Sequence, residues 1–265
     1  MRDSYNRPIR YLRVSVTDRC NLRCAYCAPR GEHRPIGGEG LLPLGDIARI
    51  VSAAVGLGVD KVRLTGGESL SREGIVGLVE ELAGIAGLET LCMTTNGTML
   101  APLAADLKTA GLDSLNLSLD TLDPALYERI TGGGSLGEAL EGMDAALKAG
   151  LPVKVNIVVL DGESGGDAAE VERYARARGA SSQRIRRYDL SLPKVDDPRF
   201  DRPPPCGRCD RIRLLANGRL KPCLHSDLAV PIDMNDIEGS ILSCVAIKPE
   251  RGGACADHDV GRIGG

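Results

Sequence analysis

Short apolar runs alternate with longer amphipathic runs along the chain up to about Ser191. The short runs are typical of strands, and the longer runs repeat apolar positions three and four residues apart, as helices do. The predicted strands are Tyr11–Val16, Lys61–Leu64, Thr90–Met93, Ser114–Leu119, Val153–Val159 and Gln183–Tyr188. The predicted helices are Leu44–Val55, Ile75–Ile85, Leu103–Ala110, Leu136–Ala149 and Ala168–Arg178. This alternation indicates an α/β fold with a parallel sheet, and six strands predict a partial (β/α)6 barrel rather than a closed eightfold one.

Polar motifs follow the first four predicted strands in succession. They are Cys20, Gly66-Gly67-Glu68, Thr94-Thr95-Asn96-Gly97 and Ser118-Leu119-Asp120. In α/β barrels, the chemistry gathers at the carboxyl ends of the strands. The succession therefore predicts one active site at that end of the sheet.

The composition changes after Ser191. Residues 192–205 are rich in Pro and Asp, which is typical of a linker, and the part from Cys206 onward is organised around cysteines. We therefore predict a core domain over residues 1–191, followed by a linker and a small C-terminal iron–sulfur module over 192–265.

Charge and hydropathy exclude several classes of protein. The net charge is -3, so neither a nucleic-acid surface nor a membrane patch is expected. No apolar run is long enough to span a bilayer, and the N-terminus has no apolar signal region, so we expect a cytoplasmic protein. Aromatic residues make up 3% of the chain, so aliphatic side chains must fill its core.

Six of the nine cysteines lie in two tight groups, which in a reducing compartment indicates metal ligands. The first group, Cys20, Cys24 and Cys27, has the spacing C-x3-C-x2-C. Three thiolates can hold three irons of a [4Fe–4S] cluster, leaving one iron open to the amino and carboxylate groups of S-adenosylmethionine (SAM). A structural zinc site and an electron-carrier cluster are the alternatives, and both need a fourth ligand nearby.

The second group, Cys206, Cys209 and Cys223, has the spacing C-x2-C-x13-C. It predicts either a second [4Fe–4S] cluster with three thiolates or a zinc site completed by Cys244 or Cys255. Arg211 and Arg213 directly follow, and their alternate spacing places them on one side of an extended segment. Guanidinium groups suit phosphate oxygens, so this module predicts a nucleotide site.

The first cysteine group, with Tyr26 before Cys27, resembles the signature of the radical SAM superfamily. The resemblance implies that Tyr26 packs near the SAM adenine. It also implies that Gly66-Gly67-Glu68 contacts the SAM amino group and that Ser118 contacts the ribose or carboxylate.

Within that superfamily, the chain resembles the GTP 3',8-cyclase family of molybdenum cofactor biosynthesis. The likeness includes the segments 11–17, 63–68, 94–97, 116–120, 154–156 and 206–223 and the C-terminal Gly-Gly. It implies that GTP is contacted by Arg13, Arg63, Thr94, Lys154, Arg186, Arg211 and Arg213. It also implies that Gly264 and Gly265 reach into the active site and act there with the first cysteines. The implied cofactors are two [4Fe–4S] clusters and SAM, and the implied partners are GTP, an electron donor of flavodoxin or ferredoxin type, and the next enzyme of the pathway.

The chain also departs from that family. Members are several tens of residues longer, with the extra part expected between Leu190 and Cys206. Ser69 and Ser191 stand where Pro and Met are usual, and Cys244 and Cys255 are additional thiols. A radical SAM paralogue acting on another substrate, such as a peptide, is therefore the main alternative. A non-catalytic iron–sulfur carrier is disfavoured by the open-iron motif followed by Gly-Gly-Glu.

Overall fold

A computed structural model describes residues 1–27, 40–159, 166–187, 189–200 and 204–256 of the chain. Its strands are β1 Tyr11–Ser15, β2 Lys61–Thr65, β3 Thr90–Thr95, β4 Ser114–Ser118, β5 Val153–Val159, β6 Ser181–Arg186, β7 Arg211–Leu214, β8 Arg219–Lys221 and β9 Val230–Pro231. Its helices are α1 Leu44–Gly56, η1 Ser69–Ser71, α2 Ile75–Ala83, α3 Ala104–Thr109, α4 Pro124–Thr131, α5 Leu136–Lys148, α6 Gly166–Ala177, η2 Cys206–Arg208 and α7 Ile237–Ala246. Gly264 and Gly265 lie outside the described residues.

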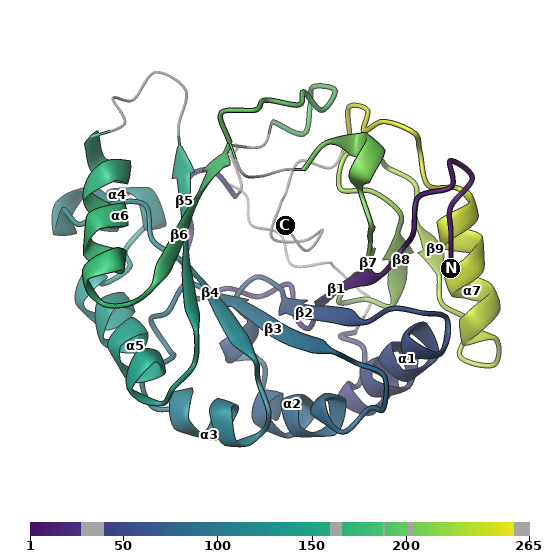
Figure 1. Cartoon of the computed structure of the whole chain (residues 1–265), viewed down its shortest axis with the longest axis horizontal. Coiled ribbons are helices and arrows are strands. Elements are labelled where there is room, and N and C mark those ends of the chain that lie inside the picture. Colours follow the sequence, from purple (N-terminus) through teal and green to yellow (C-terminus); the bar gives the residue numbers. More distant parts are fainter. Residues whose placement is uncertain (28–39, 160–165, 188, 201–203, 257–265) are drawn as a thin grey trace.

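The strands form one curved sheet in the order β6-β5-β4-β3-β2-β1-β7-β8-β9. Strands β1 to β6 pair in parallel with their sequence neighbours, and β7 pairs in parallel with β1. Strands β8 and β9 continue from β7 as antiparallel partners. The strands line the inside of an open ring, and α1, α2, α3, α5 and α6 cover its outer side (Figure 1). The expected partial barrel is confirmed, because the sheet does not close between β6 and β9 in the described part of the chain.

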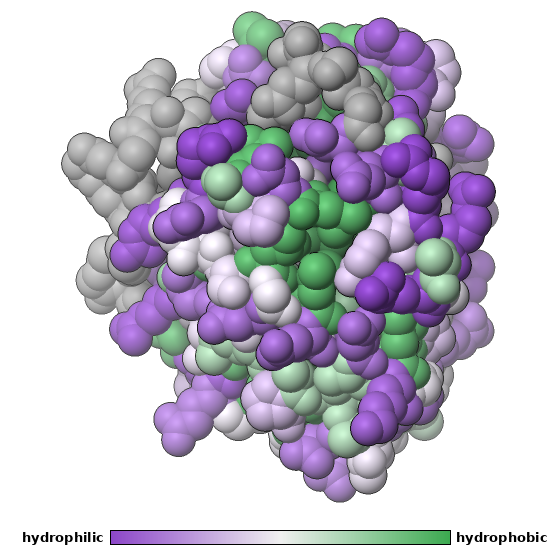
Figure 2. Space-filling model, turned by 90° about the vertical axis from the view of Figure 1, so that its left-hand side faces the viewer, coloured by the Kyte–Doolittle hydropathy of each residue, from purple (hydrophilic) through white to green (hydrophobic). Residues whose placement is uncertain are grey.

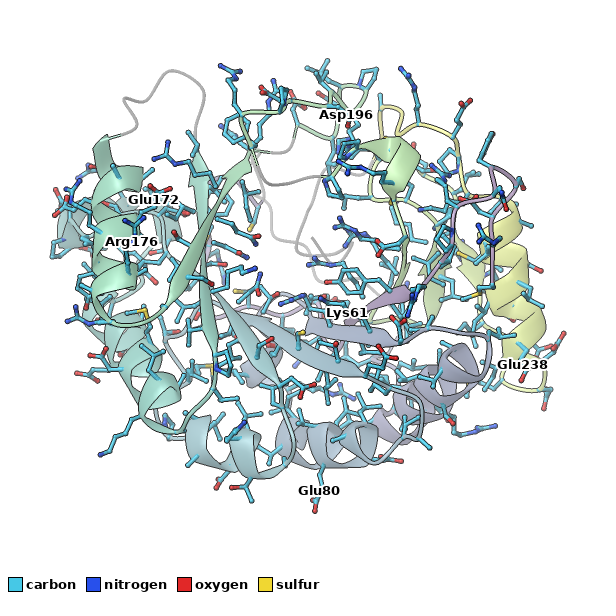
Figure 3. All side chains as sticks on the ribbon, in the orientation of Figure 1. Lys61, Glu80, Glu172, Arg176, Asp196 and Glu238 are labelled. Carbon is cyan, nitrogen blue, oxygen red and sulfur yellow. The ribbon has the colours of Figure 1, made fainter. Side chains whose placement is uncertain are left out.

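Side chains alternate along each strand between the helix layer and the interior of the barrel. The residues facing the helices are aliphatic and fully buried, such as Leu12 and Val14 on β1 and Val62 and Leu64 on β2. The residues facing the interior are mostly polar, and Lys61 points inward whereas Glu80 on α2 points away from the sheet (Figure 3). The apolar half of each strand therefore forms the core, and the polar half is left for the site.

Strand register arranges the inward side chains in rows across β7, β1 and β2. Arg211, Tyr11 and Lys61 are neighbours in one row. Arg213, Arg13 and Arg63 are neighbours in the next row. Four arginines and one lysine from distant parts of the sequence are thereby brought to one wall of the barrel.

The predicted strands and helices of the core are found within about two residues of their expected bounds. The largest shift is at β6, which covers Ser181–Arg186 instead of Gln183–Tyr188. The sequence reading missed α4, α7 and the strands after Cys206, where it expected only an extended segment around Arg211 and Arg213. Because β7 joins the same sheet as β1, the C-terminal part packs directly on the core, and the division at residue 191 stays a prediction.

The surface on the side of α4, α5 and α6 is mainly polar, with apolar residues gathered near its middle (Figure 2). Within the described ranges, no helix is both long and apolar enough to cross a bilayer.

Gly142 on α5 packs against the turn after β3. A Cβ atom placed on Gly142 would lie 2.1 Å from the carbonyl oxygen of Gly97. We predict that Gly142→Ala lowers the free energy of unfolding by about 1–3 kcal/mol, because this contact is with backbone and cannot relax cheaply. Gly137→Ala on the exposed start of the same helix, where the nearest atom would be 3.6 Å away, is the control. Denaturant unfolding should show Gly137→Ala unchanged or up to about 1 kcal/mol more stable, and equal stability of the two variants would contradict the packing argument.

Candidate functional site

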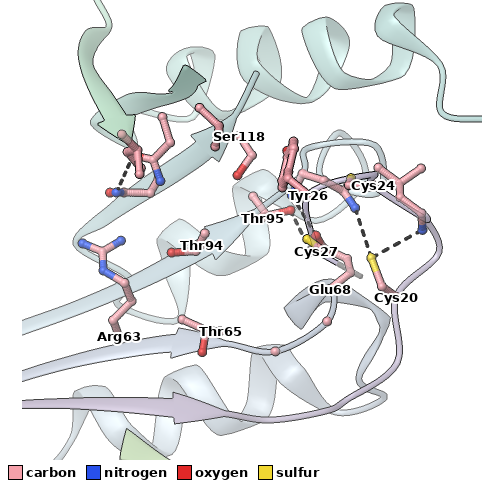
Figure 4. Close-up of a pocket in the computed structure, with 18 of the residues that line it drawn as sticks. Cys20, Cys24, Tyr26, Cys27, Arg63, Thr65, Glu68, Thr94, Thr95 and Ser118 are labelled. Atoms are coloured by element: carbon pink, nitrogen blue, oxygen red, sulfur yellow. Dashed lines mark hydrogen bonds between the residues drawn. The ribbon is translucent and has the colours of Figure 1, made fainter. Parts of the chain in front are cut away.

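A large cavity lies inside the barrel, and its lining extends from the first residues of β1, β2 and β7 to the loops that follow β1 to β4. Among its lining residues are three thiols, three carboxylates and six cationic side chains. The thiols and carboxylates are Cys20, Cys24, Cys27, Asp18, Glu68 and Asp120. The cations are Arg13, Lys61, Arg63, Arg186, Arg187 and Arg211. Arg63 lies at one side of this cavity and the three cysteines at the other, with Thr94 and Thr95 between them (Figure 4).

The cysteine loop is tied to the end of β3 by side-chain amides. The Nδ2 group of Asn96 donates to Oδ1 of Asn21 at 2.9 Å and approaches the sulfur of Cys20 at 3.9 Å (Figure 4). Nδ2 of Asn21 donates in turn to the hydroxyl of Thr98 at 2.8 Å. The amide N–H of Leu22 donates to the Cys20 sulfur at 3.4 Å. These contacts fix the first thiol relative to the sheet.

The thiols of this loop differ in acidity. Burial, together with the charges of Glu68 and Cys24, raises the pKa of Cys20 to about 11. A hydrogen bond with Cys27 lowers the pKa of Cys24. In the absence of a bound metal, Cys24 is therefore the more acidic of these two thiols.

Gly66 and Gly67 allow the loop after β2 to press against the cysteine loop. A Cβ atom on Gly67 would lie 2.2 Å from the carbonyl oxygen of Arg19, and one on Gly66 would lie 2.6 Å from that of Thr17. The amide of Gly67 donates to Thr17 and the amide of Glu68 donates to Arg19, at 2.9 and 2.8 Å. Glycine is required here because the two backbones are hydrogen-bonded at contact distance.

The carboxylate of Glu68 is buried and joins the β2 loop to β3. Its Oε1 atom accepts hydrogen bonds from the amide of Leu70 at 3.0 Å and the hydroxyl of Thr95 at 2.7 Å. Its Oε2 atom accepts from the amide of Asn96 at 2.8 Å. Burial raises the pKa of Glu68 even though these donors act to lower it. Ser69 adds a second tie to β3, since its hydroxyl donates to the carbonyl of Thr94 at 2.8 Å.

Tyr26 lies between the thiols and β4. It forms a hydrogen bond with Asp120, and burial together with the charges of Asp120 and Cys24 raises its pKa well above the ordinary value. Asp120 is itself held by the amide of Val158 on β5 at 2.7 Å. Ser118, at the end of β4, lines the same cavity.

Tyr11 stands at the centre of the cationic wall. Its hydroxyl accepts a hydrogen bond from Nε of Arg63 at 2.8 Å, and the charged groups of Arg211 and Lys61 lie 5.6 and 5.5 Å from its ring centroid. Burial acts to raise the pKa of Tyr11, but the charges of Arg13, Arg63 and Arg211 outweigh it, and the pKa is lowered. The Tyr11 oxygen thus accepts from one cation and lies close to two others, and Arg211 is also within 3.9 Å of the carboxylate of Asp210.

Three side-chain amides line the cavity on β4, β5 and β6. Asn116 and Gln183 are hydrogen-bonded to Asn156, at 3.0 and 2.5 Å. They add neutral polar groups to this wall, which also carries Arg186 at the end of β6 and Arg187 directly after it.

A second, smaller cavity adjoins the first one. It is lined by Cys206, Cys209 and Cys223 together with five cations, Arg7, Lys194, Arg211, Arg213 and Lys248. Arg211 lines both cavities, and its Nε atom is buried without a hydrogen-bond partner among the described residues. Burial acts to raise the pKa of Cys209, but the charge of Lys248 and the amide and charge of Arg211 outweigh it and lower the pKa.

Cys244 and Cys255 are not among the residues that line this second cavity in the described part of the chain. Cys244 lies on the core side of α7, where it is fully buried and where burial raises its pKa to about 12. Cys255 packs with Leu190, Leu215 and Leu224.

Each thiol group consists of three cysteines that line a cavity, a donor set that an iron–sulfur cluster can use. Among the residues placed by the structure, no three His, Cys, Asp or Glu side chains converge on one point. A [4Fe–4S] cluster instead places each thiolate on a different iron, so its ligands surround a space. Cys20, Cys24 and Cys27 line one cavity in this way, and Cys206, Cys209 and Cys223 line the other.

Comparison with known proteins agrees with this geometry. Residues 14–175 match the Radical SAM superfamily. A GTP 3',8-cyclase of Peptoclostridium acidaminophilum is 37% identical over 317 aligned positions, covering 99% of this chain and 98% of the relative. The chain belongs to the radical SAM superfamily and to its GTP 3',8-cyclase family. A GTP 3',8-cyclase of Geobacter sulfurreducens is 34% identical, with 99% of each chain covered. An alignment of 317 positions against 265 residues also requires gaps in this chain, as expected for a shortened family member.

Solved structures show the same fold at lower identity. Streptococcus suis SuiB bound to S-adenosylmethionine has a TM-score of 0.66 at 17% identity, covering 89% of this chain and 68% of that chain. Native anSMEcpe with bound AdoMet and Kp18Cys peptide has a TM-score of 0.65 at 13% identity, covering 91% of this chain and 81% of that chain. These likenesses establish the radical SAM type of partial barrel.

Most of the residues singled out from the sequence meet at these two cavities. The first cavity gathers Arg13, Cys20, Cys24, Tyr26, Cys27, Arg63, Gly66, Gly67, Glu68, Thr94, Ser118, Arg186 and Arg211. Lys154 is exposed on β5 and is not among the lining residues, although it shares a strand face with Asn156. Sequence reasoning missed Tyr11 and Lys61, whose alternation with Arg13 and Arg63 was the available signal. It also missed Asn156, Gln183 and Lys248.

Glu68→Gln tests the buried carboxylate. We expect the free energy of unfolding of the metal-free chain to fall by about 1–3 kcal/mol, because the amide group of Gln cannot accept the donors that now meet one carboxylate oxygen. Glu73→Gln, a change at an exposed residue of the same loop, is the matched control and should be neutral. Chemical denaturation followed by circular dichroism measures both, and equal midpoints would show that the hydrogen bonds to Glu68 do not hold the loop.

Proposed function

We propose that this chain is a radical SAM lyase that cyclises GTP to 3',8-cyclo-7,8-dihydro-GTP in molybdenum cofactor biosynthesis. The observation that carries the proposal is the segregation of charge within one cavity. The carboxylates Asp18, Glu68 and Asp120 line it together with the three thiols, and the wall built by β1, β2 and β7 is cationic. SAM carries a sulfonium and an ammonium group, whereas GTP carries a triphosphate, so the two molecules favour opposite ends.

Cys20, Cys24 and Cys27 would hold a [4Fe–4S] cluster with one open iron. When bound, the cluster and SAM together supply the one-electron chemistry that removes a hydrogen atom from the substrate ribose. Tyr26 offers a ring for stacking against adenine, and its contact with Asp120 fixes the ring's orientation. Ser118 offers a hydroxyl to the SAM ribose or carboxylate. Gly66 and Gly67 lack side chains, so the loop after β2 can approach the amino group of SAM closely.

The cationic wall binds and orients the triphosphate. Arg63 uses Nε for Tyr11 and a weaker contact at 3.3 Å for the carbonyl of Met93, so most of its donors remain for a ligand. Arg13 and Arg211 flank Tyr11 from β1 and β7, and planar guanidinium groups can each grip two phosphate oxygens. Holding both ends of the substrate limits the positions that a reactive ribose carbon can attack.

Cys206, Cys209 and Cys223 would hold the second [4Fe–4S] cluster, which would leave one iron available to bind the purine. Its support is that three thiols share a cavity with Arg211 and Arg213, while Cys244 and Cys255 lie elsewhere. We extend the proposal to Thr94, Lys154 and Arg186 as further GTP contacts and to Gly264 and Gly265 as catalytic residues of the C-terminal tail. A cytoplasmic location, an electron donor of flavodoxin or ferredoxin type and transfer of product to the next enzyme of the pathway complete it.

Anaerobic incubation with SAM, dithionite and GTP tests the activity. The reconstituted chain should form 3',8-cyclo-7,8-dihydro-GTP together with 5'-deoxyadenosine, measured by mass spectrometry. Cys24→Ala should abolish both products, because the open-iron cluster is lost. Cys223→Ala should keep some 5'-deoxyadenosine without cyclised GTP. Cleavage of SAM by the intact chain with GTP left unchanged would transfer the activity to another substrate, such as a peptide.

Arg211→Ala tests the nucleotide site, since Arg211 lines both cavities. Loss of charge-assisted hydrogen bonds worth about 1.5–3 kcal/mol should weaken GTP binding about tenfold to a hundredfold. Arg211→Lys should recover part of the affinity for GTP, because lysine restores the positive charge but not the planar guanidinium group that binds two oxygens at once. Arg178→Ala on the exposed surface beside Tyr174 is the control. Equilibrium binding to the reconstituted chain measures all four proteins, and unchanged affinity in Arg211→Ala would remove this residue from the site.

A further inference from the structure

Lys248 is a buried lysine at the second thiol group, in the segment that follows α7. Its side chain lines the second cavity, and the residue is 3% exposed. Its Nζ atom donates to the carbonyl oxygens of Arg211 and Pro222, both at 2.7 Å, and approaches the sulfur of Cys209 at 3.5 Å. The three hydrogens of the ammonium group are thus directed at two carbonyls and one thiol.

The thiol is the one contacted group that can carry a full negative charge. No carboxylate lies within ion-pair distance of Lys248 among the residues that the structure describes. Arg7, which lines the same cavity, shows the usual arrangement, because its Nε atom pairs with the buried carboxylate of Asp3 at 2.6 Å. A buried ammonium group needs a compensating anion, so the surroundings of Lys248 point to an anionic sulfur.

The contacts of Lys248 also join the two ends of the β7–β8 hairpin, which separates Cys209 from Cys223. Cys209 precedes β7 and Arg211 begins it, whereas Pro222 comes after β8 and directly before Cys223. One side chain therefore fixes the spacing between the second and third cysteines of the group. Removing the Lys248 side chain would remove the hydrogen bonds that hold both Cys209 and the residue before Cys223 in place.

We propose that Lys248 is a positioning residue of the second thiol group, which holds Cys209 in its ligand position and offsets the negative charge of a thiolate-bound metal cluster. The inference rests on the second [4Fe–4S] cluster of the proposed function. A fixed positive charge beside the cluster favours its reduced, more negative state. Lys248 therefore has two separable effects: its hydrogen bonds retain the cluster, and its charge raises the cluster's reduction potential.

Three substitutions separate these effects. Lys248→Gln keeps a donor for the carbonyl oxygens and removes the charge. Lys248→Met removes both, and Lys248→Arg restores the charge. Lys221→Met is the matched control, because Lys221 is also 3% exposed, lies on β8, donates to the carbonyl of Ser226 and is not among the described residues lining the second cavity.

The first measurement is the iron and sulfide content of each variant. The second is the reduction potential of the second cluster, which electron paramagnetic resonance monitors during an anaerobic titration with dithionite. Full-length chains in which Cys20, Cys24 and Cys27 are changed to Ala isolate this cluster. Lys248→Gln should retain about four irons and shift the potential to more negative values. Lys248→Arg should stay near the parent potential, Lys248→Met should also lose iron, and Lys221→Met should match the parent.

A parent-like potential in both Lys248→Gln and Lys248→Met would overturn the inference. If circular dichroism shows that Lys248→Met is poorly folded, the reduction potentials of Lys248→Gln and Lys248→Arg decide the role of the charge. A parent chain that binds zinc or no iron at Cys206, Cys209 and Cys223 would instead show that the second cluster of the proposed function is wrong. The two failures are distinguishable, because one appears in the parent and the other in the Lys248 variants alone.

Discussion

The parallel pairing of β7 with β1 is the constraint on which the rest of the site depends. It places Arg211 beside Tyr11 and Arg213 beside Arg13, residues about two hundred positions apart in the sequence. This pairing sets the register between the strand that follows Cys209 and the strand that precedes the first thiol group. The same register makes Arg211 a wall of both cavities, so a ligand held there can meet both thiol groups.

Local patterns made the core fold and the first thiol group predictable. Strand alternation separates Leu12 and Val14 from Arg13, and the spacing of Cys20, Cys24 and Cys27 lies within one loop. The missed helix α4 carried local signals too, since Asp123 caps its first turn through hydrogen bonds to the next two amides and Pro124 follows. Its short, polar sequence lacked the apolar repeat that identified the other helices.

The rest depended on pairings between distant segments. Lys61 could be placed on the inner face of β2 by alternation, but its approach to Tyr11 follows from the register between β1 and β2. Lys248 gives no motif in the sequence, and its contact with Cys209 exists because α7 packs against β8 and β9 and the segment after it reaches Cys209. The strands after Cys206 were likewise missed, because two to four residues are too few to show a period.

The two cavities compensate their cations in different ways. At the first cavity, Tyr11 accepts from Arg63 and lies near Lys61 and Arg211, but a phenol oxygen offsets little of their combined charge. The electrostatic energy of that wall is therefore lowered most by an anion that binds reversibly, as a substrate does. At the second cavity, Lys248 is fixed by two backbone carbonyls and directed at a thiol, and the proposed cluster would supply a counter-charge that stays in place. On the proposed function, the cations on the barrel interior therefore meet an anion that exchanges, whereas the buried Lys248 meets one that stays bound.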